Sequence, residues 1–537
     1  MSKRNAYTVA AGGLLAYLAW CLGFVWSTSF LIDGERYFCL SEDAMISMTY
    51  ARNLVEGHGL VWARWGEPVE GFSNPLWTLG LVLVQWSALP LSLRPLLVQL
   101  TSLALLLINL LMIYRLARRH LCPNYPQLAW AAPVATAAYF PLNYWALVGM
   151  ESGLQALLTT LAVLWTFDLV DSERPRAFRL WCVLTAAAFL RLDMMILVIL
   201  VLGYVLAFAK PKSVNRAGLL AGMALFALVL GGYAMFRFLY YHDILPNTYW
   251  LKMTGGDPLV RIARGYAVFL DVAQNMATVL VVVLAGGFVT AVSRRRHLLL
   301  AGLVCGYFAY SIYIGGDVYE GFLTGNRFVC FVIPILTCLA VGVADVVASR
   351  WLPIHWEKSR VLPLLLSAWL VLALNGLLVG AHADARWRSL RLDGTPYLYD
   401  LYKRVLTDTL RLKAQFPPQT RVSVVWAGIP SYFSDFRMVD SFGYNDRTIA
   451  TGPWSAEASR EQPRQYVPGH MKTNLDFTLR EYAPDVFFQT LPAWQQSLRS
   501  AGYRRYSTGT EIFRTAGEIW VREPLTLDDS PWQIQGD

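Results

Sequence analysis

The sequence predicts a polytopic α-helical membrane protein with a polar C-terminal domain. Hydrophobic residues make up 55% of the 537 positions and charged residues only 15%, whereas charged residues are about a quarter of a soluble domain. Long apolar runs fill the chain as far as residue 380, and the composition is polar and mixed beyond it. The net charge of +9 does not indicate a nucleic-acid partner, because Lys and Arg cluster in short loops between the apolar runs, as topology determinants do.

The first apolar run, residues 7–32, is expected to be an uncleaved membrane span. The chain begins with the basic stretch Met1–Arg4, which is similar to the start of a signal peptide. The run is nevertheless long enough to cross a bilayer, and no small-x-small cleavage site follows it. We therefore expect a cytoplasmic N-terminus and a first external loop over residues 33–93.

Within that loop, residues 75–90 are expected to form a juxtamembrane helix on the outer leaflet. Their apolar part is only about fourteen residues long, short of the ~20 that a span requires. If both this run and the run 94–114 crossed the membrane, the basic cluster Arg115–His120 would lie outside, against the positive-inside rule. The run 94–114 is therefore interpreted as the second span.

The apolar runs that follow predict further spans, about eleven in all, with the C-terminus outside. In this arrangement the basic loops that separate alternate spans lie on the cytoplasmic side, as the positive-inside rule requires. The predicted further spans are 127–149, 152–170, 177–191, 194–209, 217–238, 265–291, 298–314, 328–347 and 361–380.

The chain is expected to divide into a transmembrane domain, residues 1–380, and an external C-terminal domain, residues 381–537. The second segment is long enough for a small domain. Residues 421–426 read as a strand followed by a turn at Gly428–Pro430, and residues 474–482 read as a helix. These signals favour an α/β or α+β domain.

Two adjacent carboxylates, Glu42 and Asp43, open a predicted helix in the first external loop. One interpretation is helix capping, with Ser41 at the N-cap and two acids in the first turn, where the helix dipole favours negative charge. The other is a general base, because a carboxylate at a membrane surface can accept the proton of an acceptor hydroxyl.

Charged residues also follow the outer ends of later predicted spans. Glu151 lies beyond one span, and Arg191 and Asp193 separate two others. Such residues can snorkel to the interface or set topology, and they can also be functional; Arg191 and Asp193 can simply form an ion pair.

The segment 240–252 combines aromatic, amide, acidic and ammonium side chains at the predicted outer surface. This mixture suits a ligand that is half lipid and half sugar phosphate, and Lys252 can neutralise a phosphate as a compact charge. The alternative is an aromatic belt with a snorkelling lysine. The candidates here are His242, Asp243, Asn247, Tyr249, Trp250 and Lys252.

Gly315 and Gly316 break a helix and expose Asp317, and Arg327 opens the next predicted span. An Asp317–Arg327 ion pair is the structural interpretation. The sequence contains no GxxxxGK[ST], GxGxxG, HExxH or GxSxG motif, so nucleotide-driven pumping, dinucleotide redox chemistry and these hydrolase classes are unsupported. Acids in an outer loop fit transfer from a donor that a lipid phosphate has already activated.

Several blocks, in their order along the chain, resemble bacterial GT-C glycosyltransferases, and specifically the polyprenyl-phosphate arabinofuranosyltransferases. That group includes the enzyme that caps cell-wall arabinan with terminal β-(1→2) arabinofuranose, and the blocks are also similar to pilin arabinosyltransferases. The blocks are Ser41–Ser47, Tyr50–Trp62, Val69–Asn74, Gly149–Leu154, Leu190–Asp193, Asp243–Lys252, Gly315–Asp317, Asn326–Phe328, Asp440–Asp446 and Pro468–His470.

The resemblance implies a GT-C membrane fold with a periplasmic C-terminal domain in the bacterial inner membrane. It implies a polyprenyl-phosphate-sugar donor held under the first loop, with arabinofuranose the expected sugar and a cell-envelope glycan or protein as acceptor. The family motif reads Asp-Asp-Ala-aromatic-Ile-Ser, whereas this chain has Glu42 in place of the first Asp and Met45 in place of the aromatic residue. The role of catalytic base therefore passes to Asp43, with Glu42 as a partner or alternative.

The remaining roles follow from the same resemblance. Lys252 is expected to offset charge on the departing phosphate, with Arg191 and Arg327 as helpers. Asn247 is expected to bind a sugar hydroxyl, and Tyr249 to pack against the isoprenoid or sugar. The further site candidates are Glu70, Asn74, Glu151, Asp193, His242, Asp243, Asp317 and His470.

Two alternatives remain open at this stage. The donor sugar can be a hexose or aminoarabinose, with lipid A or a protein as acceptor. The chain can also be a transporter or flippase of a lipid-linked sugar, although that class places polar groups near the membrane midplane and shows internal repeats. No cofactor is implied with certainty; Glu42, Asp43 and Asp317 are candidate ligands for a divalent cation.

Overall fold

The computed structural model describes residues 3–171, 177–209, 216–291, 295–320, 325–352, 356, 359–378, 382–455, 466–507, 517–527 and 533–534. The chain forms two compact units, each assembled from three stretches of sequence. Unit 1 comprises Met1–Thr28, Leu97–Tyr233 and Arg261–Tyr397, and unit 2 comprises Ser29–Leu96, Ala234–Val260 and Leu398–Asp537. The polar C-terminal segment thus packs with two stretches that precede it in the sequence.

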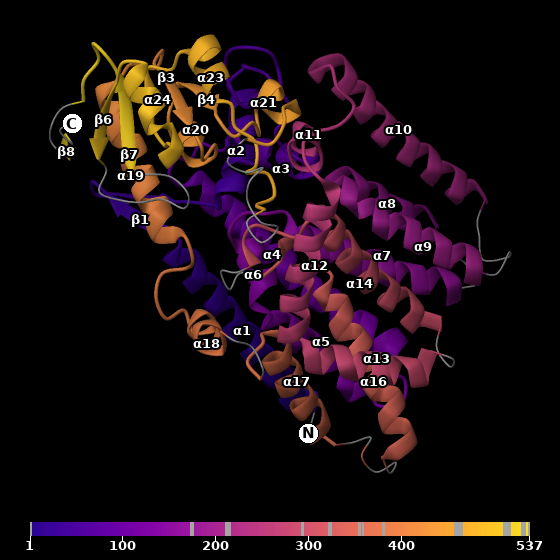
Figure 1. Ribbon diagram of the computed structural model, residues 1–537. Helices are drawn as coiled ribbons and strands as arrows, with labels where there is room; N and C mark the ends of the chain where they lie inside the picture. The colour runs from indigo at the N-terminus through magenta and orange to yellow at the C-terminus, as the bar shows by residue number, and fades with distance from the viewer. Residues whose placement is uncertain are drawn as a thin grey trace. The chain divides into compact units, whose positions relative to one another are not determined.

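Unit 1 is helical throughout its described residues (Figure 1). Two of its helices, α4 and α12, begin in unit 2, and α10 ends there. The helices are α1 (Lys3–Ser27), α4 (Arg94–Leu116), η1 (Ala117–Leu121), η2 (Pro126–Trp130), α5 (Ala131–Ala137), α6 (Phe140–Leu147), α7 (Ser152–Asp171), α8 (Ala177–Leu190), η3 (Leu192–Met194), α9 (Met195–Phe208), α10 (Arg216–Tyr241), α12 (Pro258–Asn275), α13 (Ala277–Ala291), α14 (Arg295–Ile314), α15 (Arg327–Cys330), α16 (Ile333–Trp351), α17 (Val361–Leu374) and α18 (Ala383–Leu390).

Among the described residues, five helices are long and apolar enough to cross a membrane, or six if the bent pair α12–α13 forms one span. Five more apolar helices of 10–17 residues accompany them, at 11–27, 75–85, 177–190, 192–208 and 361–374. The chain is a multi-pass membrane protein, and the count of eleven spans remains a prediction.

Two of the predicted spans are broken helices. The run 127–149 divides into η2, α5 and α6, because Pro141 in the first turn of α6 has no N–H with which to continue α5. The Asn375 side chain satisfies the broken ends: its Oδ1 accepts from the Phe140 N–H and its Nδ2 donates to the Ala138 carbonyl, both at 3.0 Å.

The predicted span 265–291 is also wrong as a single helix. It belongs to α12 and α13, which meet at an angle of 85° at Met276. The buried residues of α12, Arg261, Gly265, Val268 and Val272, repeat every three to four positions and form one face. An amphipathic helix of this kind buries a single stripe, whereas α13 is apolar on all sides.

The centre of unit 1 is a group of packed helices, α5, α13, α16 and α17, which lie side by side in Figure 1. In the most apolar stretches of α7 and α16, 78% of the helix is buried inside the protein, whereas the figure for α10 is only 6%. The exposed apolar side chains of α10, such as Leu220 and Leu228, are therefore available to lipid.

Unit 2 contains the first external loop, the segment around α11 and the C-terminal domain. Its described elements are β1 (Ser29–Ile32), β2 (Glu35–Phe38), α2 (Glu42–Val55), α3 (Pro75–Gln85), α11 (Asn247–Met253), α19 (Tyr399–Gln415), β3 (Arg421–Val424), α20 (Ile429–Phe433), β4 (Arg437–Asp440), α21 (Arg447–Thr451), α23 (Leu475–Phe477), η8 (Thr478–Tyr482), β5 (Val486–Phe487), η9 (Pro492–Trp494), α24 (Gln495–Ser500), β6 (Tyr503–Ser507), β7 (Glu518–Arg522) and β8 (Gln533–Ile534).

The C-terminal part of unit 2 is organised by a six-stranded mixed sheet of order β4-β3-β5-β7-β6-β8. Strand β3 pairs in parallel with β4 and β5, and the other pairs are antiparallel. A core of Phe487, Trp494, Leu498, Tyr503 and Trp520 packs against it. The α/β or α+β expectation is confirmed, including the strand from Arg421 and the helix near 474–482, whereas Gly428–Pro430 leads into the helix α20.

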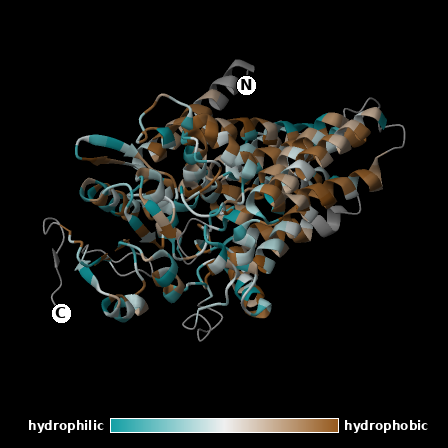
Figure 2. Ribbon diagram, turned by 90° about the horizontal axis from the view of Figure 1, so that it is seen from above, coloured by the Kyte–Doolittle hydropathy of each residue, from teal (hydrophilic) through white to brown (hydrophobic). Residues whose placement is uncertain are grey.

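The first external loop forms two helices, α2 and α3, which pack against each other, and α2 also packs against α20. Pro75 occupies the first turn of α3, where its missing N–H leaves no bond unmade. The predicted helix at 75–90 is thus present, and its position on the outer leaflet remains a prediction. Figure 2 shows mainly hydrophobic residues along the long helices, and a mixture of hydrophilic and hydrophobic residues on the strands and short helices.

Candidate functional site

The adjacent carboxylates at the start of α2 lie in different environments. Glu42 is buried, and its carboxylate accepts hydrogen bonds from the Gly428 N–H and, at 3.1 Å, from the Ile429 N–H at the start of α20. Asp43 is only partly buried. Ser41 occupies the N-cap position of α2, but its side chain makes no capping hydrogen bond. Of the two acids, Glu42 therefore joins parts of unit 2, and Asp43 is the better placed to meet a ligand.

Burial dominates the electrostatics of Glu42. It raises the pKa of this carboxyl from 4.5 to about 8, although the Gly428 and Ile429 N–H groups act in the opposite direction and the charge of Asp43 adds to the rise. Two neighbouring carboxyls with separated pKa values are a pattern found in acid–base sites, and also in structural ones.

Glu70 forms a buried ion pair with Arg237 near the end of α10. Arg237 Nε lies 2.7 Å from Glu70 Oε2, and Arg237 Nη2 donates to Glu70 Oε1 at 2.9 Å. The carbonyl of Glu70 also accepts from the Asn247 N–H at 2.9 Å, which joins the loop to α11. The next residue must be glycine, because a Cβ at Gly71 would lie only 2.0 Å from Asn445 Oδ1.

Asn74 has a local structural role. Its Oδ1 accepts hydrogen bonds from the Ser47 hydroxyl of α2 at 3.1 Å and from the Thr78 hydroxyl of α3 at 3.0 Å. The Glu70–Asn74 block therefore holds α2, α3 and the chain before α11 together.

Asn247 joins α11 to the loop Asp440–Asp446. Its Nδ2 donates to the carbonyls of Gly443 at 2.8 Å, Tyr444 at 2.9 Å and Asp446 at 3.2 Å. Its buried Oδ1 has no hydrogen-bond partner within the described residues. Only this oxygen is available for the predicted contact with a sugar hydroxyl.

The residues around Asn247 differ in exposure. Asp243 accepts from Trp250 Nε1 at 2.7 Å and pairs with Arg447, and these groups lower its pKa although burial acts in the opposite direction. His242 is exposed and has a left-handed backbone (φ 55°), and Tyr249 is 40% exposed. Asp243 is therefore a structural anchor, while His242 and Tyr249 face outward.

Lys252, Tyr444 and His470 lie close together in unit 2. The Lys252 ammonium lies 5.5 Å from the centroid of the Tyr444 ring, and the His470 ring lies 5.9 Å from the same ring. Gly469 (φ 79°) makes this approach possible, because a Cβ there would lie 2.5 Å from the Tyr444 hydroxyl and 3.0 Å from Lys252 Cε. A half-buried ammonium beside an aromatic ring and an imidazole can bind an anionic or sugar-bearing ligand.

Asp440 holds this aromatic loop in place. Its carboxylate accepts from the N–H groups of Phe442, Gly443 and Asn445 at 2.8–3.1 Å, and burial raises its pKa to about 6 despite those bonds. A second, buried lysine, Lys472, donates to the carbonyl of Trp250 at 2.9 Å, and burial lowers its pKa to about 8. Both residues shape the surroundings of Lys252.

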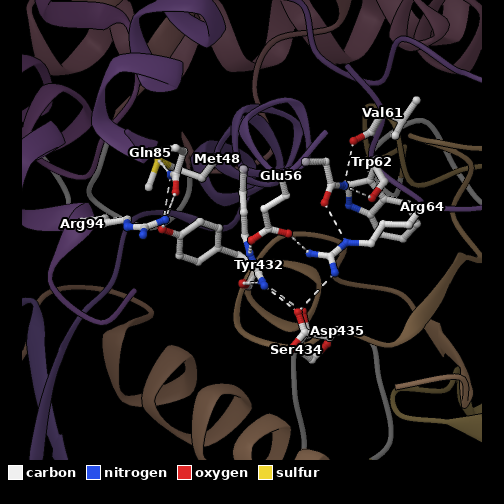
Figure 3. A network of polar contacts seen from close by, with 12 residues as sticks. Met48, Glu56, Val61, Trp62, Arg64, Gln85, Arg94, Tyr432, Ser434 and Asp435 are labelled. Atoms are coloured by element: carbon white, nitrogen blue, oxygen red, sulfur yellow. Dashed lines mark hydrogen bonds and ion pairs between the residues drawn. The ribbon is translucent and has the colours of Figure 1, made fainter. Parts of the chain in front are cut away.

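A polar network that sequence reasoning missed joins α2 to the chain after α20 (Figure 3). Arg52 Nε donates to Glu56 at 2.7 Å and Arg52 Nη1 to the carbonyl of Tyr432 at 2.7 Å. Asp435 receives Arg52 at 2.5 Å and Arg64 at 3.3 Å. Arg52 and Glu56 form an i,i+4 pair on α2, which a helical pattern could have revealed, whereas Asp435 lies 383 positions from Arg52 and no local pattern indicates it.

In unit 1, Glu151, Arg191 and Asp193 form one buried ionic cluster. Arg191 Nη1 lies 2.6 Å from Glu151 Oε1, and Arg191 Nη2 lies 2.7 Å from Asp193 Oδ2. The predicted Arg191–Asp193 pair is present, and Glu151 extends it. One guanidinium facing two carboxylates has no excess positive charge with which to bind a phosphate.

A second cluster in unit 1 contains Asp317 and Arg327. Arg327 Nε lies 3.2 Å from Asp317 Oδ1, so this predicted pair is also present. Glu320 accepts from Asn326 Nδ2 at 2.7 Å and lies 3.4 Å from Arg264, and burial raises the pKa of Glu320 well above its ordinary value. The Phe328 ring lies 5.5 Å from Arg191 and 5.3 Å from Arg327 and so connects the two clusters.

The sequence-predicted residues thus fall into two groups. Unit 2 holds Glu42, Asp43, Glu70, Asn74, His242, Asp243, Asn247, Tyr249, Lys252 and His470, and unit 1 holds Glu151, Arg191, Asp193, Asp317 and Arg327. Within the parts of the chain that the structure describes, no group of three or more His, Cys, Asp or Glu side chains is arranged to hold a metal ion.

Comparison with solved structures identifies a matching fold over nearly the whole chain. Crystal structures of ArnT from Cupriavidus metallidurans, in the apo state and bound to undecaprenyl phosphate, each match with a TM-score of 0.52. The match covers 95% of this chain and 98% of ArnT, at 12% and 13% sequence identity. The chain therefore has the GT-C fold of ArnT, as the sequence predicted.

Comparison with sequence families matches a smaller part of the chain. A family model described as a domain of unknown function (DUF8728) matches residues 400–520, which lie within unit 2. No curated protein sequence matches the chain.

Proposed function

We propose that this protein is a membrane glycosyltransferase that takes its sugar from a polyprenyl-phosphate donor. The observation that carries the proposal is the ArnT fold over 95% of the chain. ArnT is a GT-C glycosyltransferase of undecaprenyl-phosphate-linked sugars, and one of its structures holds undecaprenyl phosphate. A fold alone does not fix an activity, so the proposal also rests on the chemistry of the described side chains.

Asp43 is the proposed general base. Glu42 is buried against the start of α20, and its pKa of about 8 keeps it largely protonated near neutral pH. Asp43 is the more exposed of the two acids. In the proposed reaction Asp43 accepts the proton of the acceptor hydroxyl, the acceptor oxygen bonds to C1 of the sugar, and the C1–O bond to the lipid phosphate breaks.

Lys252 is the proposed main partner of the donor phosphate. Arg191 and Arg327 each already face carboxylates at 2.6–3.2 Å, which offset much of their charge. Lys252 is half-buried beside Tyr444, where a phosphate would meet a partly desolvated ammonium. The Tyr444–His470 surface is the proposed place for the acceptor.

The proposed donor sugar is arabinofuranose, and aminoarabinose is the alternative. The blocks that resemble the polyprenyl-phosphate arabinofuranosyltransferases, such as Asp243–Lys252, support arabinofuranose.

The proposed location is the bacterial inner membrane, with the site and the C-terminal domain on the periplasmic side. The proposed acceptor is a cell-envelope glycan or protein. The positive-inside rule, applied to the basic loops, supports this orientation.

The experiment that tests the function compares donors with the purified wild-type protein. Polyprenyl-phosphate arabinofuranose, aminoarabinose and hexose are each incubated with an envelope glycan fraction, and the products are analysed by mass spectrometry. We expect a mass increase of one pentose and release of polyprenyl phosphate. Absence of transfer from every lipid-linked donor, with a folded protein, would refute the proposal.

A further inference from the structure

Unit 1 contains a recess where α6, α12, α17 and α18 meet. Its cavity volume is about 40 Å³, and the recess is partly open to the outside. Apolar groups form most of its wall, and Asn275 and Arg386 are among its polar residues. The lining residues are Tyr139, Phe140, Pro141, Val272, Asn275, Met276, Gly325, Asn326, Val329, Leu374, Asn375 and Arg386, and none of them is acidic.

Arg386 brings a positive charge into this recess with little compensation. Within the described residues its guanidinium makes one hydrogen bond, to the carbonyl of Asn375 at 3.3 Å, and no ion pair. Burial lowers its pKa from the usual value, although the residue remains a cation. Arg386 is only partly buried, but a partly desolvated arginine with no carboxylate partner among the described residues is still costly, which indicates that an anion completes the site.

Gly376 lets the polar groups of the recess converge. A Cβ at Gly376 (φ 63°) would lie 2.0 Å from Arg386 Nη1 and 3.2 Å from the Cβ of Asn275. The guanidinium fork and an amide donor thus border one small space, as a phosphate requires. The neighbouring polar residues Asn326 and Asn375 are already engaged with protein groups.

The surroundings of the recess fit a lipid better than a free ion. The C-terminal residue of α17, Leu374, lines the recess, and the first turn and a half of the same helix presents Leu364 and Leu365, which are 69% and 63% exposed. Beside the recess, α18 carries the exposed Trp387 and Arg388, residue types that gather at the membrane interface. Acyl chains can lie along α17 while a headgroup reaches Arg386.

We propose that this recess binds the phosphate of an anionic glycerophospholipid, with Arg386 and Asn275 as its polar contacts and the exposed leucines of α17 against the acyl chains. The site differs from the residues assigned above to the sugar donor. The inference does not depend on the proposed function, because it is tested by binding.

The test measures lipid binding to the full-length protein, purified and delipidated in detergent. Palmitoyl-oleoyl phosphatidylglycerol, the matching phosphatidylcholine and inorganic phosphate are titrated separately, with native mass spectrometry and thermal unfolding as readouts. We expect phosphatidylglycerol to bind about tenfold more tightly than phosphatidylcholine, and Arg386→Gln to remove that preference. Inorganic phosphate should neither stabilise the protein nor compete.

A matched control is Arg388→Gln, an exposed arginine on the same helix. It should leave the preference unchanged. If Arg386→Gln does not fold, Asn275→Asp serves instead, because it places a carboxylate beside the retained guanidinium and should also weaken phosphatidylglycerol binding. Equal binding of both lipids, saturation by inorganic phosphate, or equal losses in the Arg386 and Arg388 variants would overturn the proposal.

Discussion

Replacing Glu42 by glutamine should remove a pH-dependent loss of stability from unit 2. Burial raises the pKa of this carboxyl from 4.5 to about 8, so the folded state holds the proton more tightly than the unfolded chain does. The contribution is therefore fully present below pH 4.5 and is lost as the pH rises through about 8. Its size is on the order of 5 kcal/mol, because one pKa unit corresponds to about 1.4 kcal/mol.

Glutamine is a suitable probe because it keeps the geometry. Its Oε1 can accept the same Gly428 and Ile429 N–H groups, and it never ionises. The assay is the free energy of unfolding in mixed micelles titrated with dodecyl sulfate, from pH 4.5 to pH 9. We expect the free energy of unfolding of the variant, measured relative to that of the wild type, to rise by up to ~1.4 kcal/mol per pH unit across this range.

The exposed acid Glu67 in the same loop supplies the control. Glu67→Gln removes the same charge without a buried site and should follow the wild-type curve. If Glu42→Gln also runs parallel to the wild type, or loses stability at high pH, then Glu42 is ionised in the folded protein. The division of roles between Glu42 and Asp43 would then be wrong.

Two further predictions follow from unit 2. Lys252→Ala should lower kcat/KM for the lipid-linked donor about tenfold or more, because a charge-assisted contact with the phosphate is lost. Lys403→Ala, at an exposed lysine, should leave kcat/KM unchanged. Steady-state kinetics over a range of donor concentrations measures both, and an unchanged kcat/KM for Lys252→Ala would show that Lys252 does not contact the donor. Glu70→Leu and Arg237→Met should each cost about 3–5 kcal/mol of unfolding free energy, because each single change leaves one buried group unpaired, and the double variant Glu70→Leu/Arg237→Met should cost less than either. A double variant as unstable as the summed single variants would contradict this.

Much of the helical architecture could be predicted from residue patterns, and the differences between prediction and structure have physical causes. Runs such as 152–170 and 298–314 became single helices, because a long apolar stretch in a membrane protein has few alternatives. The run 265–291 is bent rather than straight, and hydropathy averaged over the run hid the change from the one-sided pattern of α12 to the uniformly apolar α13. No proline or glycine adjoins Met276, so the sequence contains no local signal for the bend.

The candidate site was predictable in its residue types and much less in their partners. Pairs close in sequence, such as Arg191 with Asp193, could be predicted from spacing. The partner of Glu42 lies 386 positions away, and the carbonyls that hold Asn247 lie almost 200 positions away. Such contacts depend on how loops of unit 2 pack, which no local periodicity reports.

The most direct test of the central claim is the rate of sugar transfer by the Asp43→Asn variant, measured with purified protein and polyprenyl-phosphate pentose. The variant removes the proposed base but preserves side-chain size. We predict a loss of kcat of at least about 100-fold, with donor binding and thermal unfolding unchanged. A kcat equal to that of the wild type would show that Asp43 is not the base and would contradict the mechanism.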